Sequence, residues 1–237
     1  YQIRQYYVTR ERQSYSAALD WDINENHKLM FKGIFNNRND WESRYRTTLK
    51  DLDEEGKATV RVQTKAGTPD NRNARLERQR TMDFTLGGEH LFGPLSMDWN
   101  ASYAQATEER PNERYIDFQL KKQQFDMDLS NEREPLATPK PGSTMTLNKD
   151  FGLKELTEQQ QDIKEEDLKF SMNFKLPFQN GNKLKFGAKV VRKTKDKEVD
   201  FYEYTPKDED AFMTHSLQNT VDQTNKNFMP SNKYKAG

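Results

Sequence analysis

The chain has 237 residues, of which 32% are hydrophobic and 32% charged, and its 38 basic and 38 acidic side chains cancel. Soluble globular domains usually contain about 45–50% apolar residues, so a large two-sided core is not expected here. Disordered chains combine few aromatic residues with a high net charge, whereas this chain carries 14 Phe, 10 Tyr and 3 Trp. The balanced charge gives no argument for nucleic-acid binding. The absence of cysteine excludes disulfide scaffolds and Cys-ligated metals.

The first strong pattern is a period-two alternation from Tyr15 to Ile23, with apolar side chains at one parity and mostly polar ones at the other. Such alternation predicts a β-strand with two different faces. The run has about the length that a tilted strand needs to cross a bilayer. A turn is predicted at 24–27, where Asn residues tolerate positive φ. The return strand continues in the same register past Trp41, so the first predicted hairpin spans about 15–49.

A polar stretch of about residues 49–73 follows, in which 58–62 has the composition of a short strand. Alternation returns at Met82 and continues beyond a turn at Gly93-Pro94. These runs predict a second hairpin at about 74–106.

The next segment, about residues 107–166, is long, polar and rich in proline. Within it, 115–120 is expected to extend the sheet, and 158–166 is predicted to be a short helix or an exposed loop. A third hairpin is predicted at about 166–204 around Asn180-Gly181, a dipeptide typical of tight hairpin turns.

Three short turns therefore alternate with much longer polar connections, as in an outer-membrane barrel whose short turns face the periplasm. The fold class expected is mainly β: about six long antiparallel strands of an up-and-down transmembrane barrel, with long extracellular loops. No run approaches the roughly 18 consecutive apolar residues of a membrane helix. The side chains expected to face lipid are Leu19, Trp21, Leu29, Phe31, Phe84, Leu86, Met97, Trp99, Phe170, Phe174, Leu184 and Phe186.

The amino-acid sequences of several predicted strands resemble those of one family. The segments 15–22, 26–29 and 40–46 resemble an early barrel region of large TonB-dependent outer-membrane receptors, and 183–189 resembles a later strand of the same barrels. The resemblance covers most of residues 15–204. It rests on strand and turn sequences and includes no catalytic motif.

In that family a barrel of about 22 strands surrounds an N-terminal plug. The resemblance therefore implies that residues 1–237 are one partial barrel domain without a plug, cut from a longer protein of the bacterial outer membrane. The substrate it implies is a scarce nutrient: a siderophore, cofactor, peptide or glycan. The partners it implies are outer-membrane lipid and lipopolysaccharide, the rest of the barrel and plug, and TonB through an N-terminal part that this sequence does not contain. It also allows a surface lipoprotein as a partner.

Three residues are candidates for lining the lumen or contacting a ligand: Trp41, Arg44 and Arg46. The two arginines alternate with the lipid-facing parity and are expected to point inward. They are expected to form a salt-bridge network in the lumen with Glu42 and its neighbours, in preference to contacting the plug or an anionic ligand. Trp21 and Trp99 fit packing or an interfacial aromatic girdle, and the role of Trp41 stays open.

The sequence contains no nucleophile, nucleotide-binding or metalloprotease motif, so we expect no enzyme activity, catalytic residue, cofactor or metal site. His27, His90 and His215 lie far apart in the sequence and lack ligand spacing, so they are expected to be ordinary surface histidines. The acidic runs 51–55 and 208–210 do not have calcium-loop spacing and are expected to be solvated loops.

Two other functions remain compatible with the pattern. A soluble, secreted β-sandwich that binds carbohydrate or protein would also show alternating strands, because half-buried antiparallel sheets alternate too. A sandwich does not require short turns at one end and long connections at the other, which favours the receptor. A barrel protein of the outer membrane that does not transport is the third alternative.

Overall fold

The computed structural model describes residues 2–131, 136–143, 150–179 and 181–208. Of these residues 82% lie in strands, and none of them lies in an α-helix. The mainly β prediction is therefore confirmed. Across the described ranges, no helix has the length and apolarity to span a membrane.

Successive side chains of a strand point to opposite faces, so the alternating sequence gives strands with one apolar and one polar face. The strands are long and follow one another in the chain. Their bounds are β1 (Gln2–Asn24), β2 (His27–Lys50), β3 (Lys57–Ala66), β4 (Arg75–Phe92), β5 (Leu95–Asp128), β6 (Leu136–Pro139), β7 (Gly152–Pro177) and β8 (Lys183–Tyr204). With 34 residues, β5 is several times longer than a usual strand of about 5–6 residues.

The strands form one antiparallel sheet with six positions, in the order β1, β2, β3 or β4, β5, β7, β8. Strands β3 and β4 share the third position: β4 pairs with the first part of β2 and β3 with its last part. Between them the chain leaves the sheet through a short 3-10 helix, η1 (Pro69–Asn71). Arg72 ends this helix at φ 60°, and its N–H donates to the carbonyl of Pro69.

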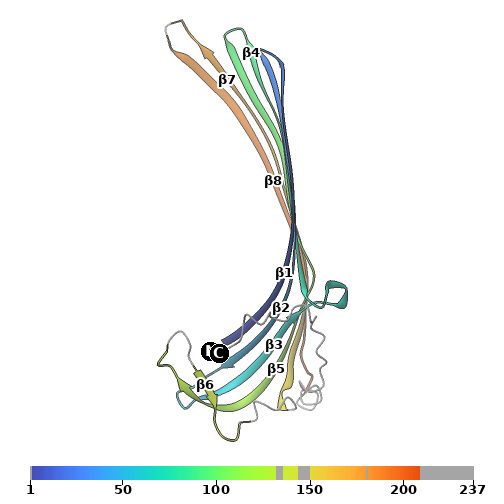
Figure 1. The fold of residues 1–237 in the computed structure, drawn as a ribbon, viewed down its shortest axis with the longest axis vertical. Helices are drawn as coiled ribbons and strands as arrows, with labels where there is room; N and C mark the ends of the chain where they lie inside the picture. Colours follow the sequence, from blue (N-terminus) through green and yellow to red (C-terminus); the bar gives the residue numbers. More distant parts are fainter. Residues whose placement is uncertain (1, 132–135, 144–149, 180, 209–237) are drawn as a thin grey trace.

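Three short turns lie at one end of the sheet, between β1 and β2, β4 and β5, and β7 and β8 (upper end in Figure 1). Gly93 adopts φ +60° and Gly181 φ +81°, conformations that glycine reaches without a Cβ clash. The β2–β3 turn and strand β6 lie at the other end, and the η1 segment projects near the middle. The three short turns predicted from the sequence therefore lie together at one end of the sheet.

The strands reach far beyond the hairpins predicted at 15–49, 74–106 and 166–204. The prediction of a helix or loop at 158–166 was wrong, since these residues belong to β7. Their backbone is paired with β5 on one side and β8 on the other. Pairing on both sides, with one register shift between Arg110 and Glu113 on the β5 side, outweighs the weak strand preference of Glu and Gln, because backbone groups need hydrogen-bond partners.

The apolar core lies at the end remote from the short turns. Leu49, Val60 and Phe118 pack with Phe125 and Phe151, which bracket the β5–β7 connection. Val60 is completely buried. Strand β6 pairs with the end of β5 here, and the sheet curls into a bowl (Figure 1). The core therefore stabilises the remote end, while the half near the short turns is one bare sheet.

Strands β1 and β8 are the two ends of the strand order. Within the described residues, no strand pairs with the outer edge of either one. Unpaired edges of more than twenty residues are templates for further strand pairing.

Candidate functional site: the two faces of the sheet

The strand pairing shows which side chains share a face, because directly opposite residues of antiparallel strands point the same way. One row can be followed across all six positions, and every residue in it is apolar. The row consists of Leu19, Phe31, Leu86, Ala101, Phe170 and Val190. This continuity is a property of the register and is not visible in any single strand.

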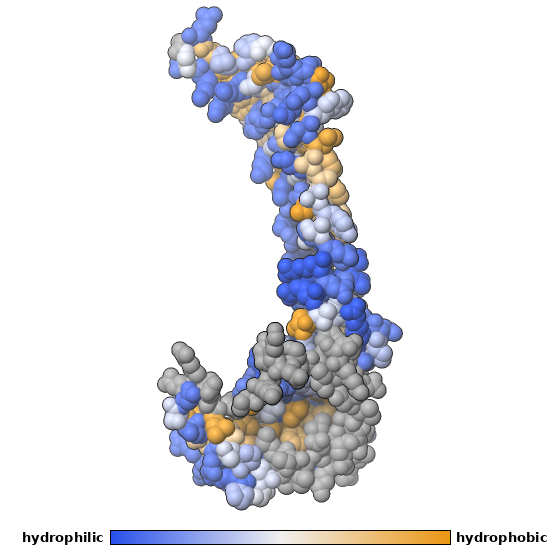
Figure 2. All heavy atoms as spheres, viewed as in Figure 1, coloured by the Kyte–Doolittle hydropathy of each residue, from blue (hydrophilic) through white to orange (hydrophobic). Residues whose placement is uncertain are grey.

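The neighbouring rows extend this row into an apolar band near the short turns. The band is exposed: Leu19 is 63% accessible, Trp21 59% and Val190 65%. All twelve side chains predicted to face lipid lie on this face. Figure 2 shows apolar atoms along one side of the upper half of the molecule. Monomeric soluble proteins rarely leave so continuous an apolar surface uncovered.

The far boundary of the band crosses the hydrogen-bonded rows obliquely. On β1 the band reaches Tyr15, whereas on β8 the charged Arg192 follows directly after Val190 in this parity. Arg192 lies in the row of Ala17, one row short of Tyr15.

An aromatic cluster occupies the short-turn edge of the band. The Nδ1 atoms of His27 and His90 lie 3.1 Å apart, and Trp99 Nε1 donates to His90 Nε2 at 3.0 Å. Phe92 packs against both histidine rings. A Cβ on Gly88 would lie 2.6 Å from Trp99 Nε1, so glycine makes room for this contact. The sequence predicted isolated histidines and missed this pair, although both lie at turns of strands that neighbour each other in the sheet.

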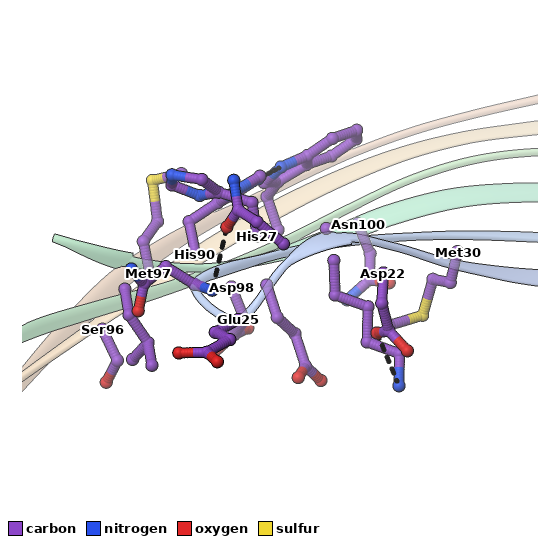
Figure 3. A pocket seen from close by; sticks show the side chains of 16 residues that line it. Asp22, Glu25, His27, Met30, His90, Ser96, Met97, Asp98 and Asn100 are labelled. Carbon is purple, nitrogen blue, oxygen red and sulfur yellow. Dashed lines mark hydrogen bonds and ion pairs between the residues drawn. The ribbon is translucent and has the colours of Figure 1, made fainter.

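A pocket surrounds the same turns (Figure 3). His27 and His90 project from one side of the strands, whereas Asp22, Met30 and Asn100 project from the other. The pocket therefore wraps around the rim of the sheet. In the described part of the chain, no group of three or more His, Asp or Glu side chains is arranged to hold a metal ion.

The opposite face is polar, and a network of ion pairs crosses it near the middle of the sheet. The network joins β1 to β5 and contains five basic and five acidic side chains, so it is neutral. Its members are Arg10, Arg38, Lys65, Arg75, Arg110, Asp40, Glu42, Glu77, Glu108 and Glu113. It spans the point along β2 at which the neighbouring strand changes from β4 to β3.

Glu77 joins three arginines of this network: it accepts a hydrogen bond from Arg38 Nη2 at 3.0 Å and forms ion pairs with Arg110 at 3.1 Å and with Arg75. Burial alone would raise the pKa of Glu77, but the three arginines outweigh it and lower the pKa below its usual value. Asp40 behaves alike: burial opposes the shift, yet the hydrogen bond from Arg10 and the charge of Arg38 lower its pKa. These carboxylates are therefore charged and paired at neutral pH.

A smaller cluster lies beyond the network. Arg61 contacts Asp117 at 3.0 Å and Glu155 at 2.9 Å, and Gln63 donates to Asp117 at 2.8 Å. Burial raises the pKa of Asp117, whose side chain is 1% accessible, against the opposing effect of Gln63 and Arg61. Arg61 thus engages both acids of this cluster.

The structure separates the three predicted lumen residues. Arg44 and Arg46 lie on the polar face as expected, but Trp41 lies on the other face, because positions 41 and 44 of one strand have opposite parity. A network around Glu42 forms on the polar face, but within the described residues neither Arg44 nor Arg46 makes an ion pair in it. Glu42 instead contacts Lys65 and Arg75.

Trp41 is 8% accessible and packs with Ala74, Leu76 and Tyr7. The guanidinium of Arg72 lies 3.9 Å from the centre of its ring, a cation–π distance. Trp41 therefore anchors the η1 segment to the sheet, between the apolar band and the remote end. The pairing of β2 with both β1 and β4 brings these residues together, so no local pattern predicted the contact.

The acidic turn 51–55 is solvent-exposed, and Asp53 Oδ1 accepts from the N–H groups of Glu55 and Lys57. His215, Glu209 and Asp210 lie outside the described residues. No protein-family model matches this chain, and a search of curated proteins finds no match.

Proposed function

We propose that this chain forms part of the wall of a bacterial outer-membrane β-barrel, with its apolar band against lipid and its charged face toward the lumen. The observation that carries the proposal is the exposed band, which continues across all six positions of the sheet. In water such an exposed apolar surface promotes aggregation, whereas the outer face of a barrel in a bilayer must be apolar.

The height of the band agrees with a membrane. The alternating run Tyr15–Ile23 contains nine residues, which at about 3.3 Å per residue gives roughly 26–30 Å along the strand. A tilt of about 40° reduces this to roughly 20–23 Å along the membrane normal, close to the ~25 Å apolar band of outer-membrane barrels. Beyond Tyr15 the same face continues with Gln13 and Glu11.

The finer proposal is that the barrel belongs to a TonB-dependent receptor that imports a scarce nutrient: a siderophore, cofactor, peptide or glycan. It rests on the resemblance of 15–22, 26–29, 40–46 and 183–189 to that family. No described strand covers the outer edge of β1 or of β8, which supports a wall that continues with further strands on both sides. In this proposal the chain performs no chemical step, and transport and TonB coupling belong to the complete barrel and plug.

The alternative of a soluble β-sandwich requires a second sheet over the apolar face. In the described residues the band is bare, and the strand outside the six positions, β6, lies at the remote end. A non-transporting outer-membrane barrel shares the wall and differs only in plug and energy coupling.

The three tryptophans provide the test. From Leu29, which lies opposite Trp21, to Trp41 is twelve residues along β2, or about 40 Å of strand. Single-tryptophan variants reconstituted into vesicles with brominated acyl chains should show strong fluorescence quenching for Trp21 and Trp99 and little for Trp41. Equal quenching of all three, or none for Trp21 and Trp99, would sink the membrane proposal. The soluble sandwich predicts that the protein stays folded without lipid or detergent.

A further inference from the structure

Three arginines gather on the polar face between the ion-pair network and the remote end of the sheet. Arg46 on β2 lies directly opposite Arg4 on β1, and Arg44 is two residues along on the same face. Like charges placed directly opposite each other destabilise a sheet. This arrangement therefore costs free energy unless something else compensates it.

The protein partners of these arginines are neutral. Arg44 Nη2 donates to Gln63 Oε1 at 2.6 Å, and Arg4 Nε donates to Gln2 Oε1 at 3.0 Å. The Nε atoms of Arg44 and Arg46 are buried without a hydrogen-bond partner in the structure. Among the described residues, no carboxylate lies within ion-pair distance of any of the three.

The neighbouring acids are already engaged. Asp117 and Glu155 contact Arg61, and Glu42 and Glu113 contact Lys65 and Arg75. Burial and the charge of Arg44 together lower the pKa of Arg46, and the attraction of Asp117 does not offset them. Hydrogen bonding with Arg44 lowers the pKa of Tyr6, as a positive local potential requires. The three positive charges are thus left unneutralised beside a network in which every charge is paired.

We propose that Arg44 and Arg46, assisted by Arg4, bind an anionic ligand through its carboxylate or phosphate oxygens. The planar guanidinium group matches such oxygens with two parallel N–H donors. Tyr115 lies beside the site, its ring centre 5.4 Å from the Arg44 guanidinium carbon, and Tyr6 lies opposite Arg44. These rings border the site and favour an anion with an organic body over a bare ion.

The neighbours of the two central arginines are in place, because β2 is paired on one side with β1 and on the other with β3. A further strand at the free edge of β1 would approach Arg4 first. The site lies on the polar face, nearer the remote end of the sheet than the apolar band of the opposite face. A ligand that enters from the remote end therefore reaches the site without contacting lipid. The inference names the ligand class of the proposed receptor and rests on that proposal only for this direction of entry.

The test is calorimetric titration of the folded full-length protein in detergent micelles with citrate and, separately, pyrophosphate at about 50 mM salt. The variant is Arg44→Gln/Arg46→Gln. The matched control is Arg78→Gln/Arg80→Gln, whose arginines lie on the opposite face and share Glu109. We expect saturable binding that weakens at least tenfold in the first variant and changes less than twofold in the control. Stronger binding of citrate identifies a carboxylate ligand, and stronger binding of pyrophosphate a phosphate ligand.

A folding defect is separable from a binding defect. Removing opposed like charges should leave the ligand-free melting temperature of Arg44→Gln/Arg46→Gln equal to the wild-type value or higher, while the rise caused by ligand disappears. No saturable binding of either anion, or equal weakening in the control, would overturn the anion site. Because the titration contains no bilayer, its result is independent of the tryptophan quenching that tests the membrane proposal.

Discussion

Substituting Leu86 by arginine distinguishes a lipid-facing sheet from a water-facing one. Leu86 lies in the central apolar row between Phe31 and Ala101 and is 47% accessible. In water, a polar substitution at so exposed a site changes the free energy of unfolding by about 0.5 kcal/mol or less. In a bilayer, an arginine near the midplane of a barrel wall costs about 2–4 kcal/mol. The two environments therefore differ by roughly 2 kcal/mol or more.

The assay is denaturant unfolding in lipid vesicles, followed by tryptophan fluorescence. The control is Thr85→Arg, one residue away on the polar face, where the new cation lies beside Asp83, whose Oδ1 accepts from the Thr85 hydroxyl at 3.2 Å. We expect Leu86→Arg to lower the free energy of unfolding by about 2–4 kcal/mol and Thr85→Arg by under 1 kcal/mol, with equal m-values. Similar losses in both variants, or a Leu86→Arg loss below about 0.5 kcal/mol, would refute a lipid-facing band.

Three further substitutions test contacts that the structure assembles. Glu77→Gln leaves three arginines without their shared carboxylate, so the free energy of unfolding at pH 7 should fall by about 2–4 kcal/mol. The pKa of Glu77 in the folded protein lies below its unfolded value of about 4.3. The stability that Glu77 contributes is therefore present above about pH 4.3 and is lost as the pH falls through the folded pKa. The free energy of unfolding should consequently fall less steeply with acid in Glu77→Gln than in the wild type. Gly88→Ala places a Cβ 2.6 Å from Trp99 Nε1 and should shift the emission of a single-Trp99 protein, whereas an unchanged spectrum would contradict the packing. Trp41→Ala removes the ring beneath Arg72 and should speed tryptic cleavage after Arg72 severalfold, with unchanged cleavage counting against this anchor.

Local alternation alone determines which face each side chain occupies near the short turns. All twelve predicted lipid-facing residues share one face, because the two-residue period is a property of the strand itself. Turn chemistry is equally local, so the hairpin ends at 24–27, 93–94 and 177–182 were predictable. The anchor at Trp41 was not, since its packing depends on residues that the chain supplies more than thirty positions later.

Only the tertiary structure decides how far the strands extend and which charges meet. Residues 158–166 have no strand pattern of their own and become a strand because ladders form on both sides. Glu42 pairs with Lys65 and Arg75, on strands that register brings to it, and among the described residues Arg44 and Arg46 have no carboxylate within ion-pair distance. Lys65 and Arg75 follow Glu42 by 23 and 33 positions, so these contacts depend on the register of the sheet and no local pattern contains them.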